Sequence, residues 1–87
     1  MYEAAITPEG LPHLNRLPEK VREAALAAIL GPIADNPQRL GKPLLGELDG
    51  LHSARRGDYR IIYEIFEAEQ VVLIHRVPHR RDVYRPR

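Results

Sequence analysis

Arginine, histidine and tyrosine side chains gather in the last third of the chain, where their types and spacing suit phosphate chemistry. The segment HRRDVYR begins at His79 and holds Tyr84 among its arginines. An arginine binds phosphate through a planar, permanently charged fork. It can neutralise the extra charge of a pentavalent phosphoryl transition state, while a histidine or tyrosine moves protons. This set contains no thiol and suits cleavage of RNA, whose 2′-hydroxyl supplies the nucleophile.

The charge of the chain is unevenly distributed. Residues 1–38 hold three basic and five acidic side chains, whereas residues 39–87 hold ten basic and seven acidic ones. The last 13 residues contain five arginines and a single aspartate. A basic tail on a nearly neutral domain indicates nucleic acid or an acidic protein as partner, and the plain alternative is a solvated tail.

Length and composition exclude several classes of protein. The 87 residues predict one small domain spanning 1–87, which leaves little room for a large cofactor. The chain has no cysteine, so disulfides, thiol nucleophiles and cysteine-based zinc sites are excluded. His75 and His79 have the spacing of a helical metal site, but their segment reads as a strand that ends at Pro78. We therefore expect no metal and no cofactor.

The first half of the chain predicts one strand and two helices. Alternating side chains indicate a strand at 2–7, and Thr7-Pro8 opens a short helix that turns Leu11 inward. A longer helix starts at Pro18 and kinks or ends at Pro32, which cannot donate a backbone hydrogen bond. Residues 37–50 are rich in proline and glycine and read as a long loop.

The second half predicts three antiparallel strands. The runs LHSARR, YRIIYEIF and VVLIHRV are rich in β-formers, and Gly57-Asp58 between the first two is a two-residue hairpin turn of type II′. The expected fold is a compact α+β domain with the order β-α-α-β-β-β. It has a mainly antiparallel four-stranded sheet, two helices on one face and a short basic C-terminal tail.

The hairpin turns predict which side chains share a face. Arg55 then opposes Arg60, and the face away from the helices carries both arginines together with His75 and Val77. Clustered arginines repel one another unless an anion lies between them. The alternative is that Arg60 is an ordinary surface residue paired with Glu64.

These residues resemble a known family. The segments GKPL, LHSARRGDYRIIY and HRRDVYR are similar to the RelE toxins of bacterial toxin–antitoxin pairs, in the RelE/ParE superfamily. RLPEKVREA and RLGKPL look like actinobacterial members, and the resemblance covers nearly the whole chain. It implies a cytoplasmic, metal-independent endoribonuclease that enters the 30S A site of the ribosome. There the 2′-hydroxyl attacks the mRNA backbone, a cyclic phosphate is left and translation stops.

The resemblance also implies partners and roles. A RelB-like antitoxin wraps the toxin, the pair contacts operator DNA through the antitoxin, and no membrane is involved. Arg60 corresponds to the arginine that stabilises the transition state, Arg80 to the one that assists the leaving group, and Tyr84 to the tyrosine that orients the 2′-hydroxyl. Two catalytic lysines of the best-known RelE correspond to Leu51 and Ser53.

The missing lysines must be replaced if the chain cleaves RNA. We expect Arg55 or Lys42 to supply the charge, and His79 or His75 to take part in proton transfer. Further RNA contacts are expected from the remaining arginines near the site, namely Arg56, Arg81 and Arg85.

Two other functions remain open at this stage. A ParE-like toxin shares the fold and inhibits DNA gyrase without cutting, and the absent lysines favour it. A catalytically inactive module that serves as antitoxin partner and co-repressor is the third possibility. The retained Arg60, Arg80 and Tyr84 favour RNA cleavage. No export signal or apolar run long enough for a membrane span is visible, in line with a cytoplasmic protein.

Overall fold

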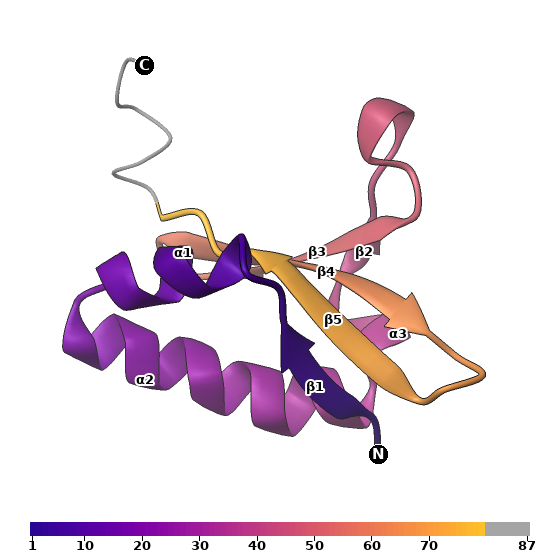
Figure 1. The fold of residues 1–87 in the computed structure, drawn as a ribbon, viewed down its shortest axis with the longest axis horizontal. Helices are drawn as coiled ribbons and strands as arrows, with labels where there is room; N and C mark the ends of the chain where they lie inside the picture. The colour runs from indigo at the N-terminus through magenta and orange to yellow at the C-terminus, as the bar shows by residue number, and fades with distance from the viewer. Residues whose placement is uncertain (80–87) are drawn as a thin grey trace.

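A computed structural model describes residues 1–79 and shows a mixed five-stranded sheet with helices packed on one face (Figure 1). The sheet order is β1-β5-β4-β3-β2, with β1 and β5 parallel and the other neighbours antiparallel. The strands are β1 (Glu3–Ile6), β2 (Lys42–Pro43), β3 (Leu51–Arg56), β4 (Tyr59–Phe66) and β5 (Val71–Arg76). The predicted α+β fold is confirmed, and the short β2 adds a fifth strand to the predicted four.

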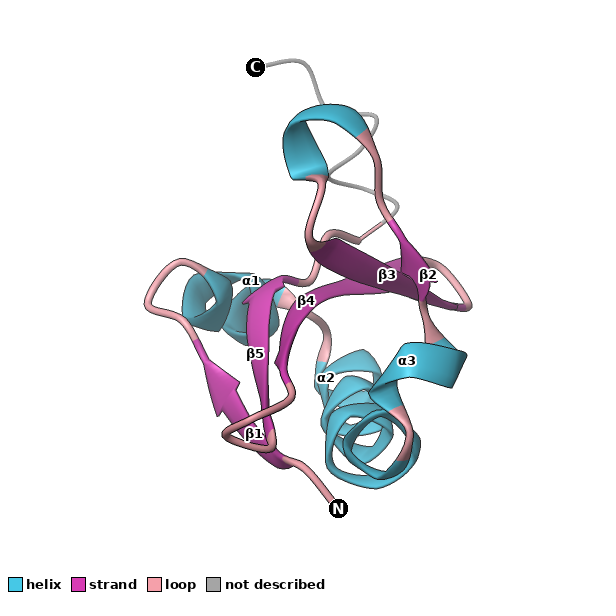
Figure 2. Cartoon of the chain, turned by 90° about the vertical axis from the view of Figure 1, so that its right-hand side faces the viewer, coloured by secondary structure: helices cyan, strands magenta, loops and turns pink. Residues whose placement is uncertain are grey.

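Three α-helices and two shorter turns connect these strands. They are α1 (Gly10–Arg16), α2 (Glu19–Ala28), a π-helical turn (Ile29–Ile33), α3 (Pro37–Leu40) and a 3-10 turn (Gly46–Leu48). Figure 2 shows α2 and α3 beneath the curved sheet, and the 3-10 turn in a loop that projects from the end near β2 and β3. None of the helices in residues 1–79 is long and apolar enough to cross a membrane.

The long helix changes its geometry at the predicted proline. Pro32 lies inside the π-helical turn that continues α2. A proline has no N–H to donate to the carbonyl one turn earlier. The wider π turn accommodates this missing hydrogen bond without ending the helix. The Asn36 N–H then bonds to the Pro32 carbonyl at 2.9 Å, so the helical path persists up to Pro37.

The core lies between the helices and the face of the sheet that the register predicts. Tyr63, Ile61, Val72 and Ile74 are fully buried there. The helices contribute Leu14, Leu17, Ala25, Ala28, Ile29 and Ile33. Leu11 was predicted to point inward but is 49 % exposed, because the short α1 presents Leu14 rather than Leu11 to the sheet.

Residues 37–50 are more ordered than the predicted loop. The Tyr63 hydroxyl donates to the Pro37 carbonyl at 2.6 Å, which ties α3 to β4. A Cβ atom at Gly41 would collide with that hydroxyl, so only glycine fits this close approach. The contact brings the next residue, Lys42, into β2 beside Ser53.

Candidate nucleic-acid interface

The hairpin of β3 and β4 places two arginines directly opposite one another. The predicted register is confirmed, with Arg55 opposite Arg60 and Arg56 opposite Tyr59. Gly57 has a φ of 56° at the turn, a left-handed conformation that favours glycine. The Arg60 N–H bonds to the Pro78 carbonyl at 3.0 Å, on the β5 side. Arg55 and Arg60 are therefore a non-hydrogen-bonded pair, the kind in which opposed side chains lie closest.

The two arginines have no acidic partner among residues 1–79. Both are exposed, and no ion pair joins either of them to a described carboxylate. Glu64, the alternative partner of Arg60, is bonded instead to His75, with 3.0 Å between Oε1 and Nε2. Two neighbouring cations that form no ion pair with a carboxylate in residues 1–79 have the electrostatics of an anion-binding site.

Lys42 extends this positive surface across the sheet edge. It pairs with Ser53 on β3, and Ser53 pairs with Ile62 on β4. Paired residues in a sheet point to the same face, and Ser53 lies two residues from Arg55. Lys42 therefore shares the face of Arg55 and Arg60.

A β-bulge changes the predicted neighbours on β5. Tyr63 pairs with Ile74, but Ile62 pairs with Arg76, so His75 is an extra residue in β5. The prediction that His75 lies beside Arg55 and Arg60 and that Val77 shares their face assumed unbroken pairing. In the structure His75 is on that face and bonds to Glu64. Val77 departs from the prediction, because it is fully buried in the core, and the Arg76 side chain points to the open face instead.

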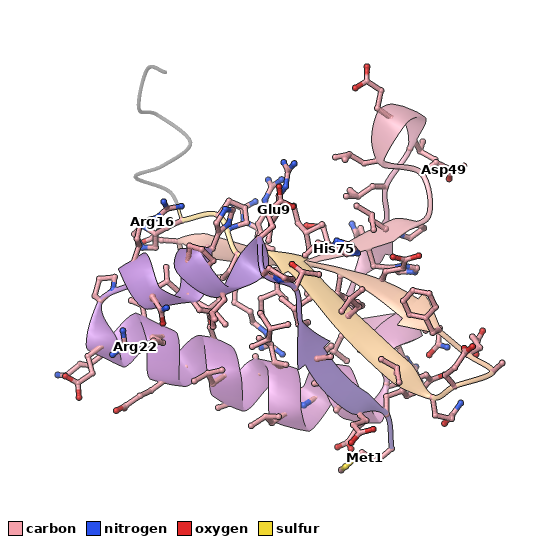
Figure 3. All side chains as sticks on the ribbon, in the orientation of Figure 1. Met1, Glu9, Arg16, Arg22, Asp49 and His75 are labelled. Carbon is pink, nitrogen blue, oxygen red and sulfur yellow. The ribbon has the colours of Figure 1, made fainter. Side chains whose placement is uncertain are left out.

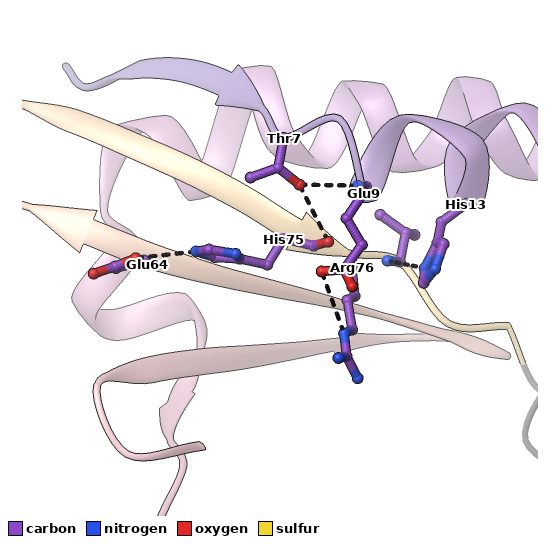
Figure 4. A network of polar contacts seen from close by, with 8 residues as sticks. Thr7, Glu9, His13, Glu64, His75 and Arg76 are labelled. Carbon is purple, nitrogen blue, oxygen red and sulfur yellow. Dashed lines mark hydrogen bonds and ion pairs between the residues drawn. The ribbon is translucent and has the colours of Figure 1, made fainter. Parts of the chain in front are cut away.

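Arg76 is thus a cation on this face that the sequence pattern does not predict. Its only described acidic contact is Glu9 on the approach to α1, with 3.8 Å between Nε and Oε1 (Figure 4). The signal for the bulge is a break in alternation, since Val72 and Ile74 are followed by Val77 and not by an apolar residue at position 76. We call Lys42, Arg55, Arg60 and Arg76 the basic cluster.

Two predicted site residues lie on the other face of the sheet. Arg56 pairs with Tyr59, and His79, beyond the end of β5, forms an isolated antiparallel β-bridge with Tyr59 from the other side. Burial raises the pKa of the Tyr59 hydroxyl, and the nearby Arg56 guanidinium partly opposes that shift. The register therefore separates Arg56 and His79 from the basic cluster. The remaining candidates, Arg80, Arg81, Tyr84 and Arg85, lie outside the described residues.

The described residues offer no ready metal centre. In the range 1–79, no three histidine or carboxylate side chains gather closely enough to hold an ion. His75 bonds to Glu64, and His79 lies opposite Tyr59, so the two histidines do not share a face. The arrangement presents cations on an open surface, which suits a polyanionic ligand.

Comparison with known proteins identifies the family. A family model described as the ParE toxin of type II toxin–antitoxin systems matches residues 6–84. The chain belongs to the RelE/ParE family of type II toxins. The toxin RelE of Mycobacterium tuberculosis is 48 % identical over 84 residues, which cover 97 % of this chain and 87 % of that protein. Toxin RelG of the same organism is 40 % identical over 84 residues, or 97 % of each chain.

Solved structures of this family share the fold. The RelBE2 toxin–antitoxin complex of M. tuberculosis matches with a TM-score of 0.88 and 39 % identity, covering 91 % of this chain and 98 % of that one. The isolated E. coli RelE toxin matches with a TM-score of 0.73 and 21 % identity, covering 91 % of this chain and 84 % of that one, which shows the fold alone.

Proposed function

We propose that this toxin is a ribosome-dependent mRNA endonuclease that cuts in the 30S A site without a metal ion. The 2′-oxygen attacks the neighbouring phosphorus, and the bond from phosphorus to the 5′-oxygen of the next nucleotide breaks. The products are a 2′,3′-cyclic phosphate and a 5′-hydroxyl. The observation that carries the proposal is the exposed pair Arg55 and Arg60, neither of which forms an ion pair with a described acidic side chain.

The basic cluster accounts for the missing lysines. Arg60 stabilises the charge that develops on the phosphoryl oxygens, and Arg55 lies directly opposite it. Lys42 pairs with Ser53, one of the two positions that lack a lysine. A lysine on the neighbouring strand can place its charge over the same part of the sheet, because adjacent strands lie only about 5 Å apart.

The proton-transfer groups belong to the end of the chain. We assign Tyr84 to orientation of the 2′-hydroxyl and Arg80 to the leaving oxygen, while Arg81 and Arg85 contact RNA phosphates. His79 is the nearest histidine in sequence to this group. These roles rest on the family motif HRRDVYR at 79–85.

A RelB-like antitoxin is the proposed inhibitor. The 39 %-identical solved structure is that of a toxin–antitoxin complex. An acidic antitoxin segment that covers the basic cluster would neutralise it and exclude mRNA. The pair would contact operator DNA through the antitoxin, and the toxin would act in the cytoplasm, where ribosomes are found.

Cleavage on programmed ribosomes tests this proposal. Purified toxin is added to stalled complexes with an open A site, and the 3′ ends of the mRNA are mapped by primer extension. We expect cuts at the A-site codon only when ribosomes are present, and their loss in Arg60→Ala. Arg39→Ala on α3 removes the same charge elsewhere and should keep full activity. Absence of cleavage by folded wild-type toxin would refute the proposal.

Inhibition of DNA gyrase is the second candidate. The matching family model is described as a ParE toxin, and Leu51 and Ser53 stand where the best-known RelE has lysines. A supercoiling assay with purified gyrase separates the two functions. Inhibition of supercoiling together with intact mRNA would favour the ParE-like activity, and failure of both assays would favour an inactive co-repressor module.

A further inference from the structure

The bulge in β5 is held by three contacts from the chain around α1. The Thr7 hydroxyl donates to the His75 carbonyl at 3.4 Å, and the Val77 N–H donates to Nδ1 of His13 at 3.2 Å (Figure 4). Gly10 packs so tightly that a Cβ atom would lie 3.0 Å from the Ile74 carbonyl oxygen and 3.1 Å from that of His75. These contacts fix the extra residue in place, and bulges of this kind often re-aim side chains beside active sites.

The bulge determines to which face of the sheet the Arg76 side chain points. Without the extra residue, strict alternation would turn this side chain toward the helices and Val77 toward solvent. With the bulge, Val77 is fully buried, and Arg76 pairs with Ile62 on the open face. Because Arg60 bonds to Pro78, Arg76 is its diagonal neighbour. Diagonal neighbours lie about 7–8 Å apart, a span that two long side chains can close around one anion.

The ion pair of Arg76 is weak enough to be exchanged. The Arg76 and Glu9 side chains are 52 % and 61 % exposed, and their closest atoms are 3.8 Å apart. Exposed pairs of this type contribute at most about 1 kcal/mol, whereas bidentate arginine–phosphate contacts are stronger. Figure 3 shows Glu9 at the start of α1, in the same region as His75 and far from Asp49 in the projecting loop.

We propose that Arg76 is an additional RNA-phosphate-binding residue, which acts beside Arg60 and is held in position by Glu9 until phosphate replaces that carboxylate. The inference rests on the proposed function, because it assigns a phosphate contact on the same surface. It adds a residue that the family motif does not include. Glu9 is a positioning residue that competes with the ligand for the guanidinium.

Binding of an uncleavable RNA tests the inference separately from catalysis. The probe is a fluorescent ten-nucleotide RNA with 2′-O-methyl groups, titrated with wild-type toxin at several salt concentrations. Arg76→Gln should weaken binding about tenfold or more, as expected for loss of one charged hydrogen-bonding contact. It should also reduce the magnitude of the salt slope by about 0.7, the value for one phosphate contact on a single strand.

Matched variants sharpen the result. Arg39→Gln on α3 removes a charge outside the basic cluster and should keep the wild-type slope. Glu9→Gln should bind at least as tightly as the wild type, because the competing carboxylate is gone. Thermal unfolding controls for folding, and the exposed position of Arg76 predicts little change in its midpoint.

The outcomes distinguish this inference from the proposed function. Unchanged affinity and slope in Arg76→Gln, or no binding of the probe by wild-type toxin, would overturn the role of Arg76. If Arg76→Gln loses binding while wild-type toxin leaves ribosomal mRNA intact, the phosphate contact stands and the nuclease function fails. If wild-type toxin cleaves ribosomal mRNA and Arg76→Gln equals it in both RNA binding and cleavage, the nuclease function stands and the phosphate contact of Arg76 fails.

Discussion

Arg55 on β3 faces Arg60 on β4 at a position where the two strands exchange no backbone hydrogen bonds. Opposed side chains are closest at such positions, and no described carboxylate pairs with either arginine. Two like charges held in this way oppose folding, so the pair is better explained by ligand binding than by stability.

Removing one of these charges should stabilise the fold and impair function. We expect Arg55→Thr to raise the free energy of unfolding by about 0.5 kcal/mol, the usual size of a cross-strand charge effect. The same variant should lose mRNA cleavage, because it removes a cation next to Arg60. Urea denaturation and the ribosomal cleavage assay measure the two effects, with Arg39→Thr as control. Cleavage at the wild-type rate would exclude Arg55 from the site.

Gly41 is required for the packing of Tyr63. A methyl group at this position would collide with the Tyr63 hydroxyl and lies 3.1 Å from the Ser53 carbonyl. Gly41→Ala should therefore lower the free energy of unfolding by about 1–3 kcal/mol, the range for overpacked sites. Gly31→Ala is the matched control, since a methyl group there meets no atom within 4 Å. Equal urea midpoints for the two variants would contradict the close approach.

The turn at Gly57 should tolerate asparagine better than alanine. Its φ of 56° is a left-handed conformation that costs most residues about 1–2 kcal/mol. Asparagine adopts this conformation more readily, so Gly57→Asn should be less destabilising than Gly57→Ala. The difference between their urea midpoints measures the effect, and the reverse order would argue against this turn.

Alkaline pH should destabilise the toxin through Tyr63. Burial raises the pKa of its hydroxyl from 10.0 to about 12, while a backbone hydrogen bond with Gly41 partly opposes the shift. The folded state holds this proton more tightly than the unfolded state. The resulting stability is fully present below pH 10 and is lost as pH rises toward about 12, a change of roughly 2–3 kcal/mol.

Urea unfolding between pH 9 and 12 measures this change. Tyr63→Phe should be less stable at neutral pH, because the Pro37 carbonyl loses its donor. Its stability should fall less steeply above pH 10 than that of the wild type. Tyr2→Phe, at a partly exposed position, is the control and should retain the wild-type slope.

Association with an acidic antitoxin should depend on salt. The basic cluster is exposed, so long-range attraction accelerates encounter at low ionic strength. Raising salt to about 0.5 M shortens the screening length to a few ångströms and should slow association. Stopped-flow measurements give the on-rate. An on-rate that does not change with salt would show that the cluster does not steer the antitoxin.

The antiparallel register and the buried face could be predicted from the sequence. The Gly57-Asp58 turn sets the pairing of Arg55 with Arg60, and period-two alternation assigns Ile61 and Tyr63 to the core. These features depend on neighbours in one hairpin, where turn geometry and alternation act together. The motifs LHSARRGDYRIIY and HRRDVYR indicated the toxin family by resemblance.

Other features of the site depend on contacts between distant segments. The bulge at His75 arises where Thr7, Gly10 and His13 press against β5, and it alone brings Arg76 to the open face. Lys42 joins the sheet because Tyr63 anchors the chain at Pro37. Local sequence therefore determined four of the five strands and the pairing of β3 with β4. The tertiary structure decided which cations surround Arg60, because one inserted residue reverses the direction of every side chain that follows it.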